Sequence, residues 1–196
     1  LVKQEHSNLR ISLDIETSPV LLERLEQGKL DILVARLYAE HDKSNLRYEP
    51  LTEEPVCAVV RPGHPLLSTT GLTLRDVASA GWIAPPAGSV LRHRFELMFR
   101  EDGLAPPIDM VETAALLFIT RMLQQSDMLA VLAADVAHYY AAHGIVSVLP
   151  LAMPCRMDAF GIITRTDRLP SPAAKVMMRA LKVASLTLYG RRLEAD

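Results

Sequence analysis

Cysteine is scarce in this chain of 196 residues, which holds only Cys57 and Cys155. Neither thiol has a partner residue at a spacing typical of a metal site. A pair of cysteines without a regular framework is typical of a reducing compartment, and the sequence therefore predicts a cytoplasmic protein. We expect both thiols to be buried and to pack as small apolar side chains.

The chain also lacks an excess of positive charge. Its 21 Lys and Arg residues face 23 Asp and Glu residues, which gives a formal net charge of −2. Because there is no basic run, we expect this chain not to bind nucleic acid by itself. No apolar stretch reaches the length of a membrane span, so no membrane partner is expected. With 49% hydrophobic residues, the chain has enough material for a buried core.

Motifs of catalysis, phosphate binding and metal binding are absent as well. There is no Gly-x-Gly-x-x-Gly motif and no phosphate-binding loop, and Ser89 lacks the second glycine of a nucleophile elbow. Asp14 and Glu16 share one side of an extended segment, which is typical of a solvated face. The histidines have no metal-ligand spacing, and we expect all of them on the surface. They are His6, His41, His64, His93, His138 and His143. The sequence thus predicts no enzyme, no metal and no cofactor.

What the chain does contain is a strand–helix–strand pattern near its start. Leu9–Ile15 alternates apolar and polar residues, which predicts a half-buried strand. Thr17 or Ser18 is expected to cap a helix that has Pro19 at its first position. Leu30–Ala35 is an apolar run, as in a strand buried on both faces. Such a unit is expected to be parallel and right-handed. Its helix start would offer free N–H groups, which predicts a small-molecule pocket.

A second stretch, Ala84–Arg92, has the same character. Trp82–Ala84 is expected to be a short strand, followed by a proline-rich loop and a helix that Ser89 caps. For Ser18 and Ser89 taken singly, a structural cap is the simpler interpretation, but together they favour a pair of hydroxyls at one crevice. Trp82 is expected in the core, with a stacking wall for a ligand ring as the alternative.

Strands and helices alternate along the rest of the chain, which predicts an α/β fold. Thr113 is expected to cap a helix that runs to about Gln125, and Pro172 is expected to begin a helix that runs to about Tyr189. No linker separates two sequential domains. Proline-bounded segments near residues 55–65 and 150–158 are the expected places where the chain passes between two lobes.

Several short motifs follow one another in a specific order along nearly the whole chain. They include Leu-Glu-Gln-Gly-Lys-Leu-Asp-Ile-Leu-Val-Ala-Arg, Arg-Pro-Gly-His-Pro-Leu, Trp-Ile-Ala-Pro-Pro-Ala-Gly-Ser-Val-Leu-Arg, Val-Glu-Thr-Ala-Ala-Leu and Ser-Asp-Met-Leu-Ala-Val-Leu. This ordered set resembles the effector-binding domain of LysR-type transcriptional regulators. The combination of Trp-x-x-Pro-Pro-x-Gly with Ser-Asp-Met-Leu-Ala is most similar to the branch named after the galactose-binding-protein regulator.

The resemblance implies a type 2 periplasmic-binding-protein fold with two inter-lobe crossings. Its sheets would be mixed and mostly parallel, with helices on their faces, and its first strand would be absent from this chain. Lobe I would comprise residues 1–55 and 156–196, and lobe II residues 56–155. Cys57 and Cys155 would then lie near the two crossings, where separate thiols are preferred over a disulfide.

The family likeness also implies where an effector binds. In the family the effector lies between the lobes, and matching positions carry its contacts to this chain. They are Ser18 and Arg36 in lobe I and Gly88, Ser89, Val90 and Thr113 in lobe II. The effector would be a small acid, a sugar or a polyol.

The implied function is that of a sensor domain in a transcriptional regulator. It would form a homodimer or tetramer and would reach DNA only through an N-terminal DNA-binding domain that this chain does not contain. An effector that prefers one lobe arrangement would shift the population of states and so alter DNA binding. The alternative is a solute-binding protein of a transporter, which shares the fold.

Overall fold

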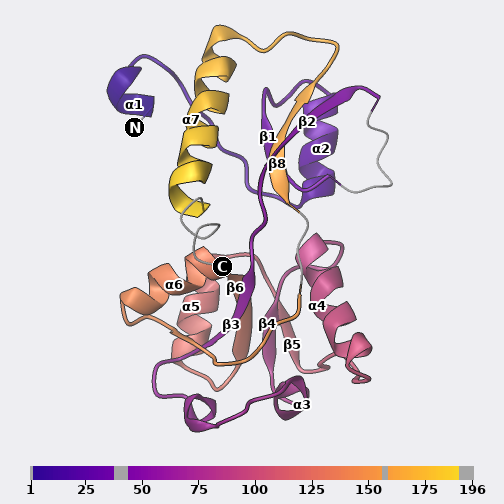
Figure 1. Ribbon diagram of the computed structural model, residues 1–196, viewed down its shortest axis with the longest axis vertical. Helices are drawn as coiled ribbons and strands as arrows, with labels where there is room; N and C mark the ends of the chain where they lie inside the picture. Colours follow the sequence, from indigo (N-terminus) through magenta and orange to yellow (C-terminus); the bar gives the residue numbers. More distant parts are fainter. Residues whose placement is uncertain (1, 38–43, 156–158, 190–196) are drawn as a thin grey trace. The chain divides into compact units, whose positions relative to one another are not determined.

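The computed structural model describes residues 2–37, 44–155 and 159–189. The chain forms two compact units (Figure 1). Unit 1 combines Leu1–Glu53 with Asp158–Asp196, and unit 2 is the continuous segment Glu54–Met157. Unit 1 is therefore built from both ends of the chain.

Unit 1 is a small sheet with helices on it. Strand β8 (Phe160–Arg165) lies between β1 (Leu33–Ala35) and β2 (Leu46–Thr52), and both pairings are antiparallel. Helix α2 (Ser18–Glu26) packs Leu21, Leu22 and Leu25 against this sheet. Helix α7 (Pro172–Tyr189) lies on the other side of the strands in Figure 1. The bounds of α7 confirm the helix predicted from its Ser-Pro start.

The strand predicted at Leu9–Ile15 is wrong. After the short helix α1 (Val2–Glu5), no strand is found before β1, and the side chains of Leu13 and Ile15 are 79% and 89% exposed. Alternation indicates a strand only where a neighbouring strand supplies hydrogen bonds, and no strand among the described residues pairs with this segment. The expected parallel strand–helix–strand unit therefore does not form in the described part of the chain.

Unit 2 has a sheet of five strands in the order β5-β4-β6-β3-β7. The strands are β3 (Val56–Val60), β4 (Trp82–Ala84), β5 (Met110–Glu112), β6 (Leu129–Ala133) and β7 (Ser147–Val148). Strand β4 is parallel to β5 and to β6, whereas β3 is antiparallel to β6 and to β7.

The expectation of mostly parallel sheets is therefore wrong, although the sheets are mixed as predicted. Parallel neighbours need a crossover connection, usually a helix. In unit 2 such crossovers are supplied by α4 (Val90–Glu101), between β4 and β5, and by α5 (Leu116–Gln124), between β5 and β6. Only these three strands are parallel to one another, and the described pairings of unit 1 are all antiparallel.

Each face of the unit 2 sheet carries its own core. Val56, Ala58 and Val60 of β3 pack toward α4 and the short helix α3 (Leu74–Val77). Val59 packs instead toward α5 and α6 (Ala134–Ala142). This follows from the two-residue period of a strand, which sends alternate side chains to opposite faces.

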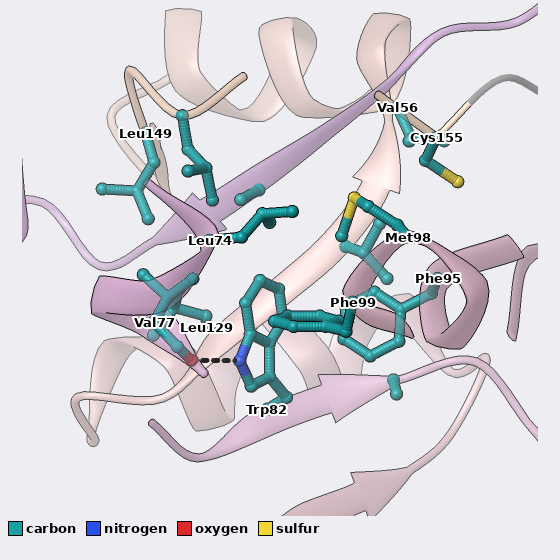
Figure 2. Close-up of a cluster of buried hydrophobic side chains, with 14 of the residues drawn as sticks. Val56, Leu74, Val77, Trp82, Phe95, Met98, Phe99, Leu129, Leu149 and Cys155 are labelled. Carbon is teal, nitrogen blue, oxygen red and sulfur yellow. Dashed lines mark hydrogen bonds between the residues drawn. The ribbon is translucent and has the colours of Figure 1, made fainter. Parts of the chain in front are cut away.

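The two cysteines fall into these different cores. Both are thiols in the structure, Cys155 buried and Cys57 half-buried. Cys155 belongs to the cluster around α3 and α4 (Figure 2), whereas Cys57 packs with the α5 and α6 cluster on the opposite face. The separation by the sheet favours the predicted role of small apolar side chains over a disulfide.

Trp82 lies at the centre of the first core. Its side chain is fully buried, and its Nε1–H donates a 3.0 Å hydrogen bond to the carbonyl of Val77 (Figure 2). Phe95 and Phe99 of α4 meet the indole edge-on, with ring centroids 4.9 and 6.0 Å away. The predicted core role is confirmed, and a stacking wall for a ligand is excluded because no ligand reaches a buried ring.

One histidine contradicts the expectation that all of them are on the surface. His64 is only 5% exposed and precedes the 3₁₀ helix η1 (Pro65–Ser68). Its Nδ1 accepts a 3.1 Å hydrogen bond from the Leu66 N–H, and its Nε2 lies 3.2 Å from the carbonyl oxygen of Asp127. These contacts fit a neutral ring with the proton on Nε2. His6, His93, His138 and His143 are exposed as predicted, and His41 lies outside the described residues.

Candidate functional site

The predicted site residues divide between the two units. Ser18 and Arg36 belong to unit 1. Unit 2 contains Gly88, Ser89, Val90 and Thr113. The residues of each unit are positioned by the helices and strands of that unit.

Of the two caps predicted for the start of α2, Thr17 and not Ser18 takes the capping position. Thr17 occupies the capping position with an extended backbone, but its hydroxyl makes no capping hydrogen bond. Ser18 is the first helical residue and does not cap, because the helix begins one residue earlier than the position of Pro19 suggests. Among the described residues the Ser18 hydroxyl has no hydrogen-bond partner either. Two half-buried hydroxyls are thus left open at this helix start.

Backbone donors accompany these hydroxyls. The first N–H groups of a helix have no partner within it, and here Leu21 donates to the Thr17 carbonyl at 3.1 Å. The N–H groups of Ser18 and Val20 precede that first helical bond, while Pro19 has none. The start of α2 therefore presents hydroxyls, N–H donors and the positive end of the helix dipole.

Arg36 follows the last residue of β1. Its guanidinium carbon lies 5.8 Å from the centre of the Phe160 ring, which begins β8. A cation over an aromatic face is attracted to it, so Phe160 orients this half-buried side chain. Because α2 and β1 are joined by a short turn at Gly28 and contact each other, Arg36 lies at the same edge of unit 1 as the start of α2.

The start of α4 is capped as predicted. The Ser89 hydroxyl accepts a 3.2 Å hydrogen bond from the Arg92 N–H and donates a 2.8 Å hydrogen bond to the carbonyl of Pro86. A serine hydroxyl has one proton and two lone pairs, so one lone pair remains. Ser89 is therefore prepared to accept one hydrogen bond from a ligand, while the N–H groups of Val90 and Leu91 donate.

Thr113 lies beside this loop, but the prediction that it caps a helix is wrong. Helix α5 begins at Leu116 with Ala115 in the capping position, and the Thr113 hydroxyl instead accepts from the Ala115 N–H at 3.0 Å. Such a turn within the threonine's own backbone competes with helix capping. The Thr113 N–H donates to the Ala84 carbonyl at 3.0 Å. The four unit 2 residues thus follow the carboxyl ends of the neighbouring parallel strands β4 and β5, where ligands bind in α/β sheets.

An ion-pair network borders the same loop, and the sequence interpretation missed it. Arg92 contacts Glu96 at 2.6 Å and Glu112 at 2.9 Å. Burial by itself lowers the pKa of Arg92, but its hydrogen bonds to the two carboxylates outweigh burial and raise it. The pKa of Glu112 is lowered, first by its hydrogen bond from Arg92 and next by the Ala87 N–H. The spacing of Arg92 and Glu96 signals their helical pair, whereas Glu112 is brought in by strand order.

Two further observations limit what the described residues do. No group of three or more His, Cys, Asp or Glu side chains among them is arranged to hold a metal ion. Asp14 accepts a 3.0 Å hydrogen bond from Arg24 of α2, which connects the preceding segment to that helix.

No helix in the described part of the chain combines the length and the apolar character that crossing a bilayer requires.

Known proteins are similar to this chain in sequence and in fold. The family model described as the LysR substrate binding domain matches residues 2–185. The chain is 36% identical over 192 residues to the HTH-type transcriptional regulator GbpR of Azospirillum brasilense, covering 97% of the chain and 56% of that protein. It is 36% identical over 178 residues to the HTH-type transcriptional regulator GalR of Pseudomonas putida, covering 91% of the chain and 45% of that protein. The chain thus spans about half the length of these relatives.

A solved structure of the Synechocystis CcmR regulatory domain in complex with 2-PG superposes with a TM-score of 0.77 at 16% identity. It covers 93% of this chain and 86% of that one. The effector-binding domain of QuiR in complex with shikimate gives a TM-score of 0.74 at 19% identity, covering 94% and 85%. At these identities the likeness establishes the fold.

The fold is that of a type 2 periplasmic-binding-protein-like domain. More particularly, the chain belongs to the LysR substrate-binding domain family. The predicted resemblance to the galactose-binding-protein regulator branch is confirmed. The relatives are transcriptional regulators, which favours a regulatory domain over the transporter alternative and over an enzyme.

Proposed function

We propose that this chain is the effector-sensing part of a cytoplasmic transcriptional regulator and that it binds one small polar molecule. The observation that carries the proposal is the pairing of a family match over residues 2–185 with an open, hydroxyl-lined helix start in unit 1. The division into two lobes at the units described above is part of the same proposal. We assign DNA binding, and with it the choice of target genes, to the part of the relatives' length that this chain does not cover.

The proposed contacts assign different chemistry to the two units. In unit 1, Ser18 and the α2 N–H groups donate to an acidic or hydroxyl oxygen, with Arg36 as the nearby cation. In unit 2, the Val90 N–H donates, Ser89 accepts from a hydroxyl, and Gly88 and Thr113 shape the wall beside them. Donors predominate in unit 1 and an acceptor is available in unit 2. This combination favours a hydroxylated acid, a sugar acid or a polyol over an apolar ligand.

A ligand screen tests this proposal directly. Sugars, polyols and small hydroxy acids such as shikimate, and in addition 2-PG, are added singly to the purified chain and its melting temperature is followed. A ligand that binds only the folded state raises the melting temperature in proportion to the logarithm of its concentration. We expect a hydroxylated acid or sugar to do so, and an apolar acid such as benzoate not to. A rise produced only by benzoate would contradict the assignment of a hydroxylated ligand.

We further propose that the chain assembles as a homodimer or a tetramer. Helix α7 supports this, because its 18 residues include only two buried ones and its apolar side chains Val183, Leu186 and Leu188 are 54%, 72% and 62% exposed. Val183 and Leu186, three residues apart, lie on one side of the helix, and an exposed apolar side of this kind is typical of an association surface. Sedimentation equilibrium is expected to give at least a dimer, and Leu186→Glu is expected to give a folded monomer whose melting temperature lacks the contribution of the interface. A wild-type chain that remains monomeric at high concentration would contradict the proposal.

A further inference from the structure

The side chain of Arg92 occupies an unusual position for a charged group. It sits in the first turn of α4, where the helix dipole disfavours a cation, and it is only 14% exposed. Its Nε donates to Glu96 at 2.6 Å, and its Nη1 donates to Glu112 at 2.9 Å and to the Pro85 carbonyl at 3.3 Å. A cation placed against the dipole and removed from water is kept there by these three acceptors.

These bonds connect α4 and β5 to the loop of residues 85–89 at three points. Arg92 holds the loop at its first residue through the Pro85 carbonyl. Glu112, held by Arg92, accepts the Ala87 N–H at 3.3 Å in the middle of the loop. The backbone N–H of Arg92 binds the Ser89 hydroxyl at its end.

Restraint of this loop matters because its own sequence permits several shapes. Gly88 has a φ of +79°. Glycine adopts positive and negative φ about equally well, so the residue alone does not fix this conformation. Rotation about Gly88 reorients the Ser89 hydroxyl and the amides that follow it. A binding loop that is already in its bound shape loses less conformational entropy when a ligand arrives, so affinity rises.

We propose that Arg92 is a positioning residue for the effector site. With Glu112 it fixes the loop so that Ser89 and the α4 N–H groups face the ligand in one orientation. This inference rests on the function proposed above, since it concerns the same site. Arg92 acts through the loop and not through contact with the effector.

A matched pair of substitutions isolates this role. Arg92→Gln removes the side-chain bonds to Pro85 and Glu112 together with a positive partner of Glu96, and it leaves the backbone bond to Ser89 in place. Arg100→Gln also removes a positive partner of Glu96, because the Arg100 side chain lies 3.0 Å from that carboxylate. The Arg100 side chain is on the same helix, is 56% exposed and makes no bond to the loop. Arg92→Lys keeps the charge and loses the planar fork that reaches several acceptors.

The first measurement is hydrogen exchange at the amides of Ala87, Gly88 and Ser89 in the ligand-free chain, with the core strand amide of Ile83 as the internal standard. Arg92→Gln is expected to speed loop exchange about tenfold without changing Ile83, since one charge-assisted bond is worth about a factor of ten. Arg100→Gln should change neither, and Arg92→Lys should keep the melting temperature of the wild type but not its slow loop exchange. Equal exchange in the Arg92→Gln and Arg100→Gln chains would overturn the proposal.

The second measurement is calorimetric titration of the same chains with shikimate and with each ligand that stabilises the wild type. About tenfold weaker binding is expected for Arg92→Gln, and Arg100→Gln is expected to bind as tightly as the wild type. Unchanged affinity in Arg92→Gln, with a ligand that the wild type binds, would also overturn the positioning role. Faster loop exchange in a chain whose wild type binds none of the ligands would uphold the restraint of the loop and count against the function proposed for the site.

Discussion

The starts of helices α2 and α4 have similar sequences and opposite states. Each has a serine next to the helix start and a proline nearby, yet Ser89 uses its hydroxyl to cap its own helix, whereas Thr17 and Ser18 leave theirs unused. In α4 the loop folds back to be capped and is held by an ion pair. In α2 the preceding segment is extended and exposed. A cap residue in a sequence therefore does not by itself distinguish a structural hydroxyl from a ligand-binding one.

The difference also extends to how each helix is anchored. Helix α4 is fixed by Phe95 and Phe99 packed around Trp82 (Figure 2). Helix α2 rests on the sheet through three leucines, and its last turn is bound by the guanidinium of Arg165, which donates to the Glu26 carbonyl at 3.1 Å. Both helices are thus immobilised away from their starts, and the starts differ mainly in whether the backbone donors are already used.

The largest expected effect is the loss of the α4 anchor. Phe95→Ala removes a fully buried ring and leaves a cavity beside Trp82, which is expected to cost about 3–5 kcal/mol of unfolding free energy. Denaturant titration measures this loss. His93→Ala, two residues away on the exposed face of the helix, is the control and should cost less than about 0.5 kcal/mol. Equal costs would mean that α4 is not anchored through this ring.

A smaller effect separates the two helix starts. Ser89→Ala removes a formed cap and is expected to cost about 1 kcal/mol. Ser18→Ala removes a hydroxyl that has no partner among the described residues, so its cost should be within about 0.5 kcal/mol of zero. Denaturant titration of both variants in the absence of ligand makes the comparison. A larger loss for Ser18→Ala than for Ser89→Ala would reverse the roles of the two starts.

The smallest effect concerns acid. The pKa of Glu112 is lowered below its ordinary value of 4.5 by its hydrogen bond from Arg92. A lowered folded-state pKa means that the stabilisation is complete above 4.5 and is lost as the pH falls through the lowered value. In the Glu112→Gln chain the melting temperature should therefore fall less steeply below about pH 4.5 than in the wild type. Near neutral pH the dependence of the melting temperature on pH should be the same in both chains. Melting temperatures from pH 3 to 7 check this, and an identical acid limb in both chains would contradict it.

The sequence predicted those features that depend on neighbouring residues. The Ser89 cap and the Ser-Pro start of α7 are local signals, and both occur in the structure. Trp82 lies in the core as predicted, since a large, mostly apolar side chain in a short strand is usually buried. The family resemblance supplied the fold.

Features that depend on distant residues were missed. Leu9–Ile15 has a strand pattern but no partner, and a partner is not visible in a local pattern. His64 is buried because Asp127, far along the chain, accepts from it. The pairing of Arg92 with Glu112 requires β4 and β5 to be neighbours, which only the strand order reveals. The predicted effector contacts came from the resemblance and remain predictions.

The most direct test of the account is the affinity of Ser18→Ala for a ligand that stabilises the wild-type chain. If the open start of α2 binds the effector, calorimetry should give about tenfold weaker binding, as expected for a lost hydrogen bond to a polar ligand, with an unchanged melting temperature in the absence of ligand. Ser68→Ala, at an exposed serine that ends η1, should bind as the wild type does. Unchanged affinity in Ser18→Ala would contradict the central claim that an unused helix start marks the effector site.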